Sequence, residues 1–217
     1  MSPYGLGIEY RDRYVAVMNE NHTKLCPSPE WAEHIQNDVL PSLVTIAELG
    51  ENMVELGPGP GAATTWLYRR VRRLVVVEAD QDAAARLSER FAGTNVEVVL
   101  GDATALDLPS DTFDSVGSFT MLHHIPTFAG QQSVLLEAFR VLKPGGVFVG
   151  SDSLASNGLH HFHEGDDYNP VDAASLVVRL QSVGFAQLTI VIDGDVRFVA
   201  RKPAFSTQEQ CGRGEEE

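Results

Sequence analysis

Glycines and carboxylates directly follow the short apolar segments in the first half of this 217-residue sequence. Gly57, Gly59 and Gly61 come after the apolar segment 53–56 and before a helical pattern at 62–70. A glycine turn between a strand and a helix lets the backbone approach a ligand at the carboxyl edge of a parallel sheet. The spacing therefore indicates a ligand site at this turn, and Glu55 adds a carboxylate beside it.

Two kinds of cofactor fit the glycine spacing. Together with Ala62, the glycines match the turn of dinucleotide-binding proteins, which hold a pyrophosphate through backbone N–H groups. Pro58 and Pro60 carry no N–H, so the turn lacks two donors for a diphosphate. S-adenosylmethionine carries no phosphate and presents ammonium and sulfonium cations, which suit Glu55 and the turn carbonyls. The turn favours S-adenosylmethionine, and an NAD(P)-dependent oxidoreductase stays the alternative.

Two further carboxylates follow the next predicted strands. Glu78 closes the strand 74–77, about 20 residues after the first glycine, where an acidic side chain accepts ribose hydroxyls. Asp102 follows the strand 96–100, where it can accept from an adenine amine while the next N–H, of Ala103, donates to the ring. Asp80 is better suited to cap the helix 81–91. Both ends of an adenosine therefore have a predicted partner.

These blocks, in this order, resemble the class I S-adenosylmethionine-dependent methyltransferases, and in particular the methyltransferase type 11 group. The matching segments are VELGPGPGAAT (54–64), VVVEAD (75–80), GDATALDLPSDTFDSV (101–116), FTMLHHIP (119–126) and EAFRVLKPGGVFVGSD (137–152). The resemblance covers about residues 50–200. It implies cofactor contacts at the following residues: Glu55, Gly57, Gly59, Gly61, Glu78, Ala79, Asp102, Ala103, Phe119 and Thr120.

Strand and helix patterns alternate along the chain, as in an α/β protein with a parallel sheet. The resemblance implies a Rossmann-like, doubly wound seven-stranded sheet in the order 3-2-1-4-5-7-6, with strand 7 antiparallel. Asp193-Gly194, between the alternating segments 186–192 and 196–201, independently predicts a terminal hairpin. We expect an N-terminal helical lid over 1–45, a cofactor-binding domain over 46–203 and a disordered tail over 204–217.

Histidines gather where an acceptor would meet the cofactor. His124 is the candidate general base, and Asp152, at the end of the strand 147–150, is predicted to face the pocket and orient the acceptor. The predicted contacts to the acceptor are His22, Trp31, His123, His160 and His161. His160, His161 and His163 stand beside carboxylates in the segment 153–170, which we expect to be a loop. Such a set can ligate a metal, but its spacing is not helical, and we predict no metal.

The composition excludes several classes of protein. The formal net charge of −14 repels phosphate backbones, so we expect a small-molecule acceptor and no nucleic acid. Cys26 and Cys211 form no C-x-x-C pair, and no segment has the 18 apolar residues of a membrane span. No apolar signal core opens the chain. We therefore expect a cytoplasmic monomer or homodimer that transfers methyl groups, with a non-catalytic cofactor-binding protein as a second alternative.

Overall fold

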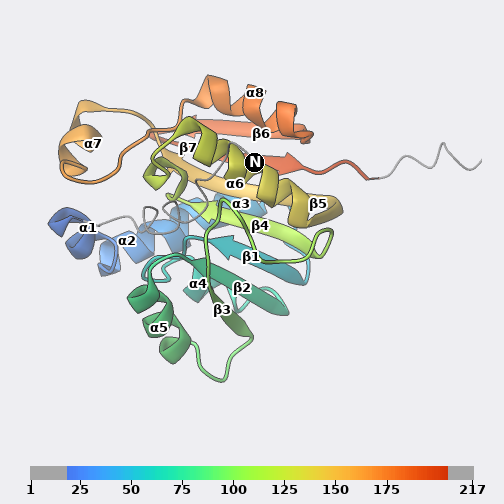
Figure 1. Cartoon of the computed structure of the whole chain (residues 1–217), viewed down its shortest axis with the longest axis horizontal. Coiled ribbons are helices and arrows are strands. Elements are labelled where there is room, and N and C mark those ends of the chain that lie inside the picture. The colour runs from blue at the N-terminus through green and yellow to red at the C-terminus, as the bar shows by residue number, and fades with distance from the viewer. Residues whose placement is uncertain (1–18, 205–217) are drawn as a thin grey trace, which may run out of the picture.

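The sheet forms the centre of the molecule, and its order confirms the expected topology. The computed structural model describes residues 19–204. Seven strands lie in the order β3-β2-β1-β4-β5-β7-β6, with parallel pairing from β3 to β5 (Figure 1). The strands are β1 (Asn52–Leu56), β2 (Arg73–Glu78), β3 (Val96–Leu100), β4 (Phe113–Phe119), β5 (Leu142–Ser153), β6 (Ala186–Asp193) and β7 (Asp195–Arg201).

Helices connect the strands and cover the sheet. They are α1 (Glu20–Leu25), α2 (Pro29–His34), α3 (Leu40–Val44), α4 (Thr64–Leu67), α5 (Gln81–Arg90), α6 (Phe128–Val141), α7 (Asn157–Phe162) and α8 (Ala173–Val183). A π-helical turn, η1 (Ile35–Val39), joins α2 to α3, and a 3-10 turn, η2 (Leu122–His124), follows β4. Within residues 19–204, no helix combines the length and the apolar character that a membrane crossing requires.

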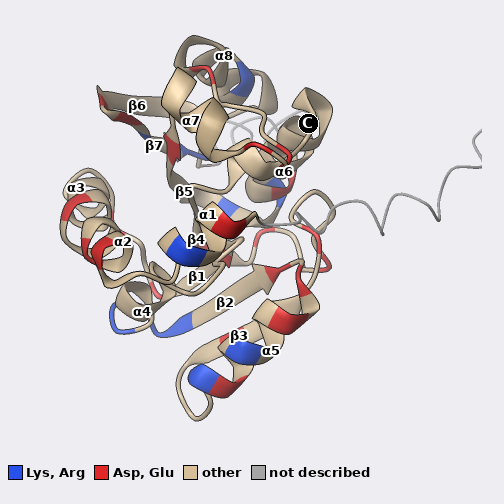
Figure 2. Cartoon of the chain, turned by 90° about the vertical axis from the view of Figure 1, so that its left-hand side faces the viewer, with Lys and Arg blue, Asp and Glu red and all other residues tan. Residues whose placement is uncertain are grey.

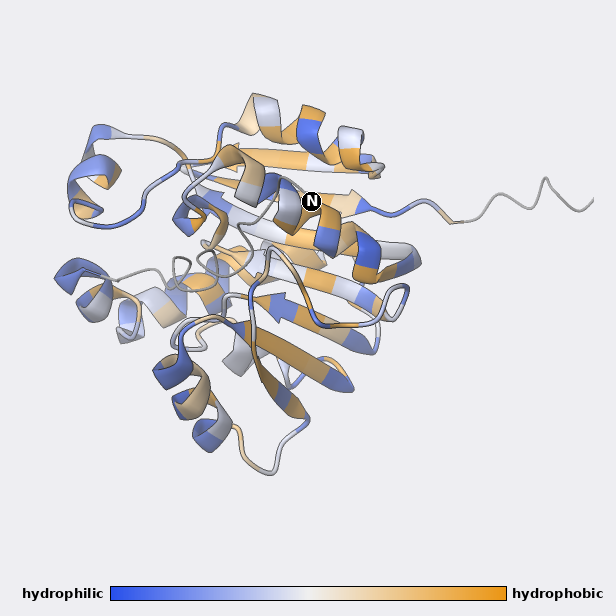
Figure 3. Ribbon diagram, viewed as in Figure 1, coloured by the Kyte–Doolittle hydropathy of each residue, from blue (hydrophilic) through white to orange (hydrophobic). Residues whose placement is uncertain are grey.

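The buried strands present apolar side chains to both faces of the sheet. In β2, Val75 and Val77 pack in a core with α6 and α8, whereas Leu74 and Val76 pack in a second core with η1, α3 and α4. Successive side chains of a strand point to opposite faces, so a run of buried apolar residues places one layer of helices on each side. Figure 3 shows the apolar strands between helices whose outer faces are polar.

The carboxyl-terminal strands form the predicted antiparallel pair. β7 pairs antiparallel with both β5 and β6. Gly194, in the turn between β6 and β7, has a positive φ of 76°, a conformation that glycine adopts at little steric cost. The Asp193-Gly194 signal therefore predicted the hairpin correctly.

The helix boundaries differ from the sequence predictions at three places. α6 begins at Phe128 rather than 131, because the Thr127 side chain caps the N–H of Gly130. The segment 153–170 is not a continuous loop: Ser156 caps the short helix α7. The predicted start of α2 is confirmed, since Ser28 caps it and Pro29 occupies its first turn. The helix then widens in η1, where the N–H of Leu40 donates to the carbonyl of Ile35 just before Pro41.

Candidate cofactor and acceptor site

A cavity of about 900 Å³ lies at the carboxyl ends of β1, β2 and β4. Its cofactor end is lined by Glu55, Gly57, Gly59, Glu78, Ala79, Asp102, Ala103, Phe119 and Thr120. Its lid end is lined by His22, Cys26, Trp31, Ile35, His124 and Ile125. Pockets of roughly 300–1,000 Å³ hold drug-sized ligands. The cavity therefore has room for both a nucleoside-sized cofactor and a second small molecule.

The glycine turn has a shape that other residues cannot adopt easily. Gly57, Gly59 and Gly61 have φ values of 61°, 53° and 85°. A Cβ atom on Gly57 would lie 2.3 Å from Cγ of Met121, whereas a Cβ on Gly59 would meet nothing within 4 Å. Gly57 is therefore required for packing against the residue that follows β4, and Gly59 opens onto the cavity.

The N–H groups of the glycine turn are all in use. Those of Gly57, Gly59 and Gly61 donate to the Val77 carbonyl at 2.9 Å, to Oε2 of Glu78 at 3.1 Å and to the Pro58 carbonyl at 2.9 Å. The two intervening prolines have no N–H. The three glycine N–H groups are thus already bonded within the chain, while the carboxylates around the turn suit the cations and ribose of S-adenosylmethionine.

Glu55 is a buried carboxyl beneath the turn. Its side chain accepts a hydrogen bond from Oγ1 of Thr64 at 2.7 Å, and the residue is only 1% exposed. Burial is the main cause that raises the pKa of Glu55 to about 8. The carboxyl is therefore largely protonated at neutral pH, and a cation placed against it would favour its ionised form.

Glu78 and Asp102 hold their loops in place from the ends of β2 and β3. Besides Gly59, the Glu78 carboxylate accepts from the backbone N–H of Asp80 at 3.0 Å. Asp80 in turn caps α5 through the N–H of Ala83 at 2.6 Å, as predicted. Oδ1 of Asp102 accepts from both the N–H and the hydroxyl of Thr104 at 2.7 Å. Both carboxylates also line the cavity, on the side that the cofactor hypothesis requires.

The end of β4 carries backbone strain. Thr120 has a positive φ of 54°, which is uncommon for a residue with a branched side chain. Its N–H donates to the Ser151 carbonyl at 2.8 Å, which holds this conformation. Such strain concentrates at functional sites. Phe119 and Thr120 both line the cavity, at the level where cofactor and acceptor would meet.

Asp152 does not reach the cavity. It is fully buried, and its carboxylate accepts from Nδ1 of His123 at 2.6 Å and from the N–H of Leu122 at 2.9 Å. Asp152 is the penultimate residue of β5, and its contacts with Leu122 and His123 cover it with η2. Asp152 therefore orients His123 and the start of η2, and of the adjacent histidines only His124 lines the cavity.

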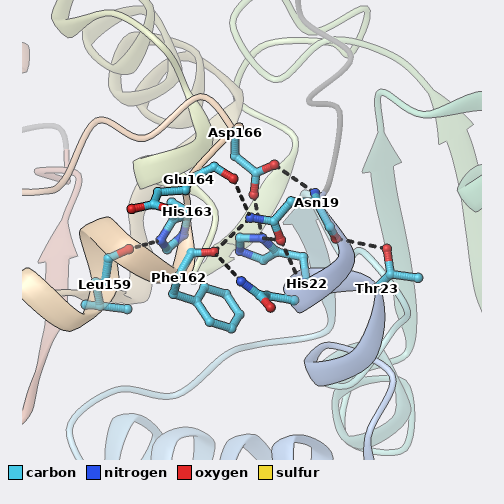
Figure 4. Close-up of polar contacts among 9 residues, drawn as sticks. Asn19, His22, Thr23, Leu159, Phe162, His163, Glu164 and Asp166 are labelled. Carbon is cyan, nitrogen blue, oxygen red and sulfur yellow. Dashed lines mark hydrogen bonds and ion pairs between the residues drawn. The ribbon is translucent and has the colours of Figure 1, made fainter.

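Helix α1, which belongs to the segment expected to form a lid, is attached to the segment around α7. The backbone N–H of Asn19 donates to Oδ1 of Asp166 at 2.7 Å, and its side-chain amide donates to the Phe162 carbonyl at 2.8 Å. Nδ1 of His22 lies 2.6 Å from Oδ2 of Asp166. Figure 4 shows these contacts, which join residues more than 140 positions apart. They fix α1 over the carboxyl ends of the strands.

The histidines of α7 diverge from one another. His160 packs edge-on against Tyr168 with ring centroids 4.9 Å apart, and His161 lies 3.0 Å from a carboxylate oxygen of Glu164. Both are exposed, and neither lines the cavity. His163, which sequence reasoning did not select as a site residue, turns inward and is 3% exposed. The H-H-x-H pattern was a signal for it, but the spacing did not show which histidine is buried.

Burial keeps the inward histidines neutral. It is the main cause that lowers the pKa of His124 to about 2, followed by the neighbouring rings of His123, His22 and His163. Burial likewise lowers the pKa of His22 and of His163. A base of such low pKa removes protons poorly at neutral pH. His124 is therefore placed to touch an acceptor but is weakly basic.

Charge is unevenly distributed around the site. Figure 2 faces the carboxyl ends of the parallel strands and shows acidic segments in the loops there, with both signs on α5. The basic side chain of Arg90 points to the turn, donating to the carbonyl of Pro60 at 2.7 Å and to Thr65 at 2.8 Å. The cavity lining thus carries charges of both signs, with the carboxylates of Glu78, Asp80 and Asp102 and the guanidinium groups of Arg86 and Arg90.

Known proteins resemble this chain mainly in the part that carries the glycine turn. The family model of the methyltransferase domain, Methyltransf_11, matches residues 54–150. A probable S-adenosylmethionine-dependent methyltransferase of Mycolicibacterium smegmatis is 29% identical over 143 residues, which are 63% of this chain and 52% of that protein. Ribosomal RNA small subunit methyltransferase A of Koribacter versatilis is 31% identical over 103 residues, which are 45% of this chain and 36% of that protein.

The fold is shared with solved structures as well. A Pyrococcus horikoshii protein superposes with a TM-score of 0.68 at 20% identity, over 81% of this chain and 92% of that one. By contrast, the chain spans about half or less of the length of the curated relatives named above. Residues 54–150 thus form a methyltransferase domain of the Methyltransf_11 family, and the sheet around them has the strand order expected of the class I S-adenosylmethionine-dependent methyltransferases.

Proposed function

We propose that this protein transfers a methyl group from S-adenosylmethionine to a small molecule held under the N-terminal lid. The observation that carries the proposal is the single cavity that joins the glycine turn to the lid helices α1 and α2. Its cofactor end has the carboxylates of Glu55, Glu78 and Asp102, and its lid end is mostly aromatic and apolar. An adenosine and an acceptor would lie end to end in it.

The chemistry asks little of the protein beyond alignment. The methyl group of S-adenosylmethionine is already activated by its positively charged sulfur. An acceptor lone pair or carbanion forms the new bond to the methyl carbon, while the C–S bond breaks and its electron pair stays on sulfur. What the chain must supply is an in-line arrangement and a site from which water is excluded. The lid, attached through Asn19 and His22, supports both tasks.

The geometry divides the predicted acceptor residues into two groups. Trp31, His22 and His124 line the cavity and are proposed to contact the acceptor. His123 and Asp152 lie behind the cavity wall and are proposed as positioning residues, since Asp152 orients the His123 ring. A small acceptor agrees with the lid that covers the strand ends and with the acidic charge of the chain. The alternative acceptor is ribosomal RNA, because ribosomal RNA methyltransferases are among the relatives.

Labelled cofactor tests this assignment directly. S-adenosylmethionine carrying a tritiated methyl group is incubated with the protein and either a deproteinised small-molecule extract or unmodified small ribosomal subunits. We expect the label in the small-molecule fraction. Label that enters only the ribosomal RNA would overturn the small-molecule assignment, although it would leave the methyl donor unchanged.

A matched pair of variants then tests the lid end. Trp31→Ala should raise the KM for the labelled acceptor about tenfold, because it removes an aromatic wall of the cavity, and should leave the affinity for S-adenosylhomocysteine unchanged. Leu136→Ala, an exposed apolar position on α6, serves as the control. Equal KM values for Trp31→Ala and Leu136→Ala would contradict the placement of the acceptor.

A further inference from the structure

Four histidines from three separate segments meet behind and beside the lid end of the cavity. His22 comes from α1, His123 and His124 from η2, and His163 from the end of α7. One nitrogen of each ring lies within 4.8 Å of the corresponding nitrogen of every other. Three of the four residues are buried, and His124 is partly so. Nitrogens of a tetrahedral zinc site lie about 3.4 Å apart, so small ring rotations would bring these four into range.

Three of the rings have their Nδ1 atoms already engaged. Nδ1 of His123 donates to Asp152 at 2.6 Å, and Nδ1 of His163 donates to the Leu159 carbonyl at 2.7 Å. Nδ1 of His22 lies 2.6 Å from Asp166. A neutral histidine that donates through Nδ1 keeps a lone pair on Nε2. Metal-bound histidines show this arrangement, in which the second nitrogen donates to a carboxylate or a backbone carbonyl.

One of these Nε2 atoms has no partner in the described structure. His163 is 3% exposed, and its Nε2 is buried without a hydrogen bond. A buried polar atom without a partner costs free energy. Figure 4 shows the other nitrogen of the His163 ring bonded to the carbonyl oxygen of Leu159, with the ring close to His22 and Asp166. A cation among the four rings would satisfy this atom.

The charges around the rings also favour a cation. The carboxylates of Asp152 and Asp166 contact two of the rings, and their side chains are 0% and 3% exposed. Buried charges normally pair with opposite charges or coordinate metals. The two positive charges of a divalent ion would neutralise the two negative charges of these carboxylates. Asp166 would interact with the ion through His22, and Asp152 through His123.

We propose that His22, His123, His124 and His163 bind one divalent transition metal ion of the zinc class. Imidazole nitrogens suit zinc, copper, nickel and iron, and four of them arranged around one point suit a tetrahedral ion. With four protein ligands, the coordination has no open position, which is typical of a structural site. The ion would connect the lid to the ends of β4 and α7. The proposed ion shares His22 and His124 with the acceptor end of the cavity, so it would stand in the cavity wall, but its binding does not require methyl transfer.

Cobalt provides the direct test, because tetrahedral Co²⁺ absorbs visible light far more strongly than octahedral Co²⁺. Chelator-treated full-length protein is titrated with Co²⁺, and then with Zn²⁺ in competition. We expect one Co²⁺ per chain with an intense visible spectrum that Zn²⁺ abolishes. A weak octahedral spectrum, or no saturable binding by the unaltered protein, would overturn the assignment.

Variants identify the ligands. His163→Gln should abolish the intense spectrum. His161→Gln, whose side chain is largely exposed, and His34→Gln on α2, whose side chain is partly exposed, should retain it, because neither ring belongs to the cluster of four. Asp152→Asn keeps all four ligands and should weaken Zn²⁺ binding about 10- to 100-fold, as loss of an outer partner does. Equal affinities for His163→Gln and His161→Gln would contradict the proposal.

A second readout covers the case in which His163→Gln fails to fold. His22 lies on the lid, outside the sheet core, so His22→Gln tests the same ion with the core intact. Zn²⁺ should slow proteolytic cleavage within α1 of the unaltered protein and should have no effect on His22→Gln. Cleavage rates that Zn²⁺ leaves unchanged in both proteins would contradict a metal that holds the lid. S-adenosylhomocysteine binding is measured in parallel, so failure of the metal site is distinguished from failure of the proposed function.

Discussion

The two ends of the cavity are built in different ways. The cofactor end consists of turns that directly follow β1, β2 and β3, and each carries its functional side chain within a few residues of the strand. The lid end is lined by residues of α1, α2 and η2, and contacts between distant segments, such as Asn19 to Asp166, hold α1 in place. One end depends on local backbone geometry and the other on long-range contacts. Substitutions should therefore affect the two ends separately.

The largest effect should come from the buried carboxyl of Glu55 at the cofactor end. Its pKa of about 8 in the folded protein exceeds the reference value of 4.5, so the folded state keeps a proton that the unfolded chain releases. Stability is therefore greatest below pH 4.5 and declines as pH rises towards 8. Relative to Glu55→Gln, the unaltered protein should lose about 4 kcal/mol between pH 5 and 8.

Urea unfolding of both proteins across this pH range measures the difference. Glu89→Gln, an exposed position on α5, is the control and should follow the unaltered protein. A constant difference between Glu55→Gln and the unaltered protein at every pH would show that Glu55 ionises normally, and the buried description of the turn would then be incorrect.

Gly57→Ala should produce the next largest effect. The new Cβ would collide with Met121 at a positive φ of 61°, so we expect the free energy of unfolding to fall by about 3 kcal/mol, with loss of S-adenosylhomocysteine binding. Gly145→Ala has a similar φ of 83° and open space around its Cβ, and should cost only about 1 kcal/mol. If both variants lost the same free energy of unfolding, the positive φ alone would account for the requirement for glycine at position 57, and the contact with Met121 would add nothing.

Glu78→Gln should weaken S-adenosylhomocysteine binding about 10- to 100-fold, because hydrogen bonds from the ribose to a charged carboxylate are lost. Isothermal titration calorimetry measures the change. The lid end should be unaffected, so protection of α1 against hydrogen exchange should stay the same. If Glu78→Gln binds as tightly as the unaltered protein, the ribose does not lie against β2.

Asn19→Ala should produce the smallest effect, and only at the lid. It removes the cap of α1 and the contact to Phe162, which together should lower local stability by about 1 kcal/mol. Hydrogen exchange should accelerate in α1 and α7 while the glycine turn keeps its protection. Asn37→Ala, an exposed position, is the comparison. Faster exchange at Gly57 as well would show that the two ends are coupled.

The contrast between local backbone geometry and long-range contacts also explains which features could be predicted from the sequence. The alternation of strands and helices, the hairpin at Asp193-Gly194 and the glycine turn were predicted because each depends on a local pattern, whereas the strand order was implied by the family resemblance. The helix α7 was missed because its cap, Ser156, lies in a polar segment that reads as loop. The inward position of His163 and the burial of Asp152 depend on contacts between distant segments. The predictions over 1–18 and 205–217, including the tail, lie outside the described residues.

Cofactor selectivity tests the central assignment most directly. The unaltered protein is titrated calorimetrically with S-adenosylhomocysteine and, separately, with NADH. Because the three glycine N–H groups of the turn are already bonded within the chain, its two prolines have none and Glu78 stands beside it, we expect one S-adenosylhomocysteine per chain and no binding of NADH. Tight binding of NADH without binding of S-adenosylhomocysteine would contradict the assignment.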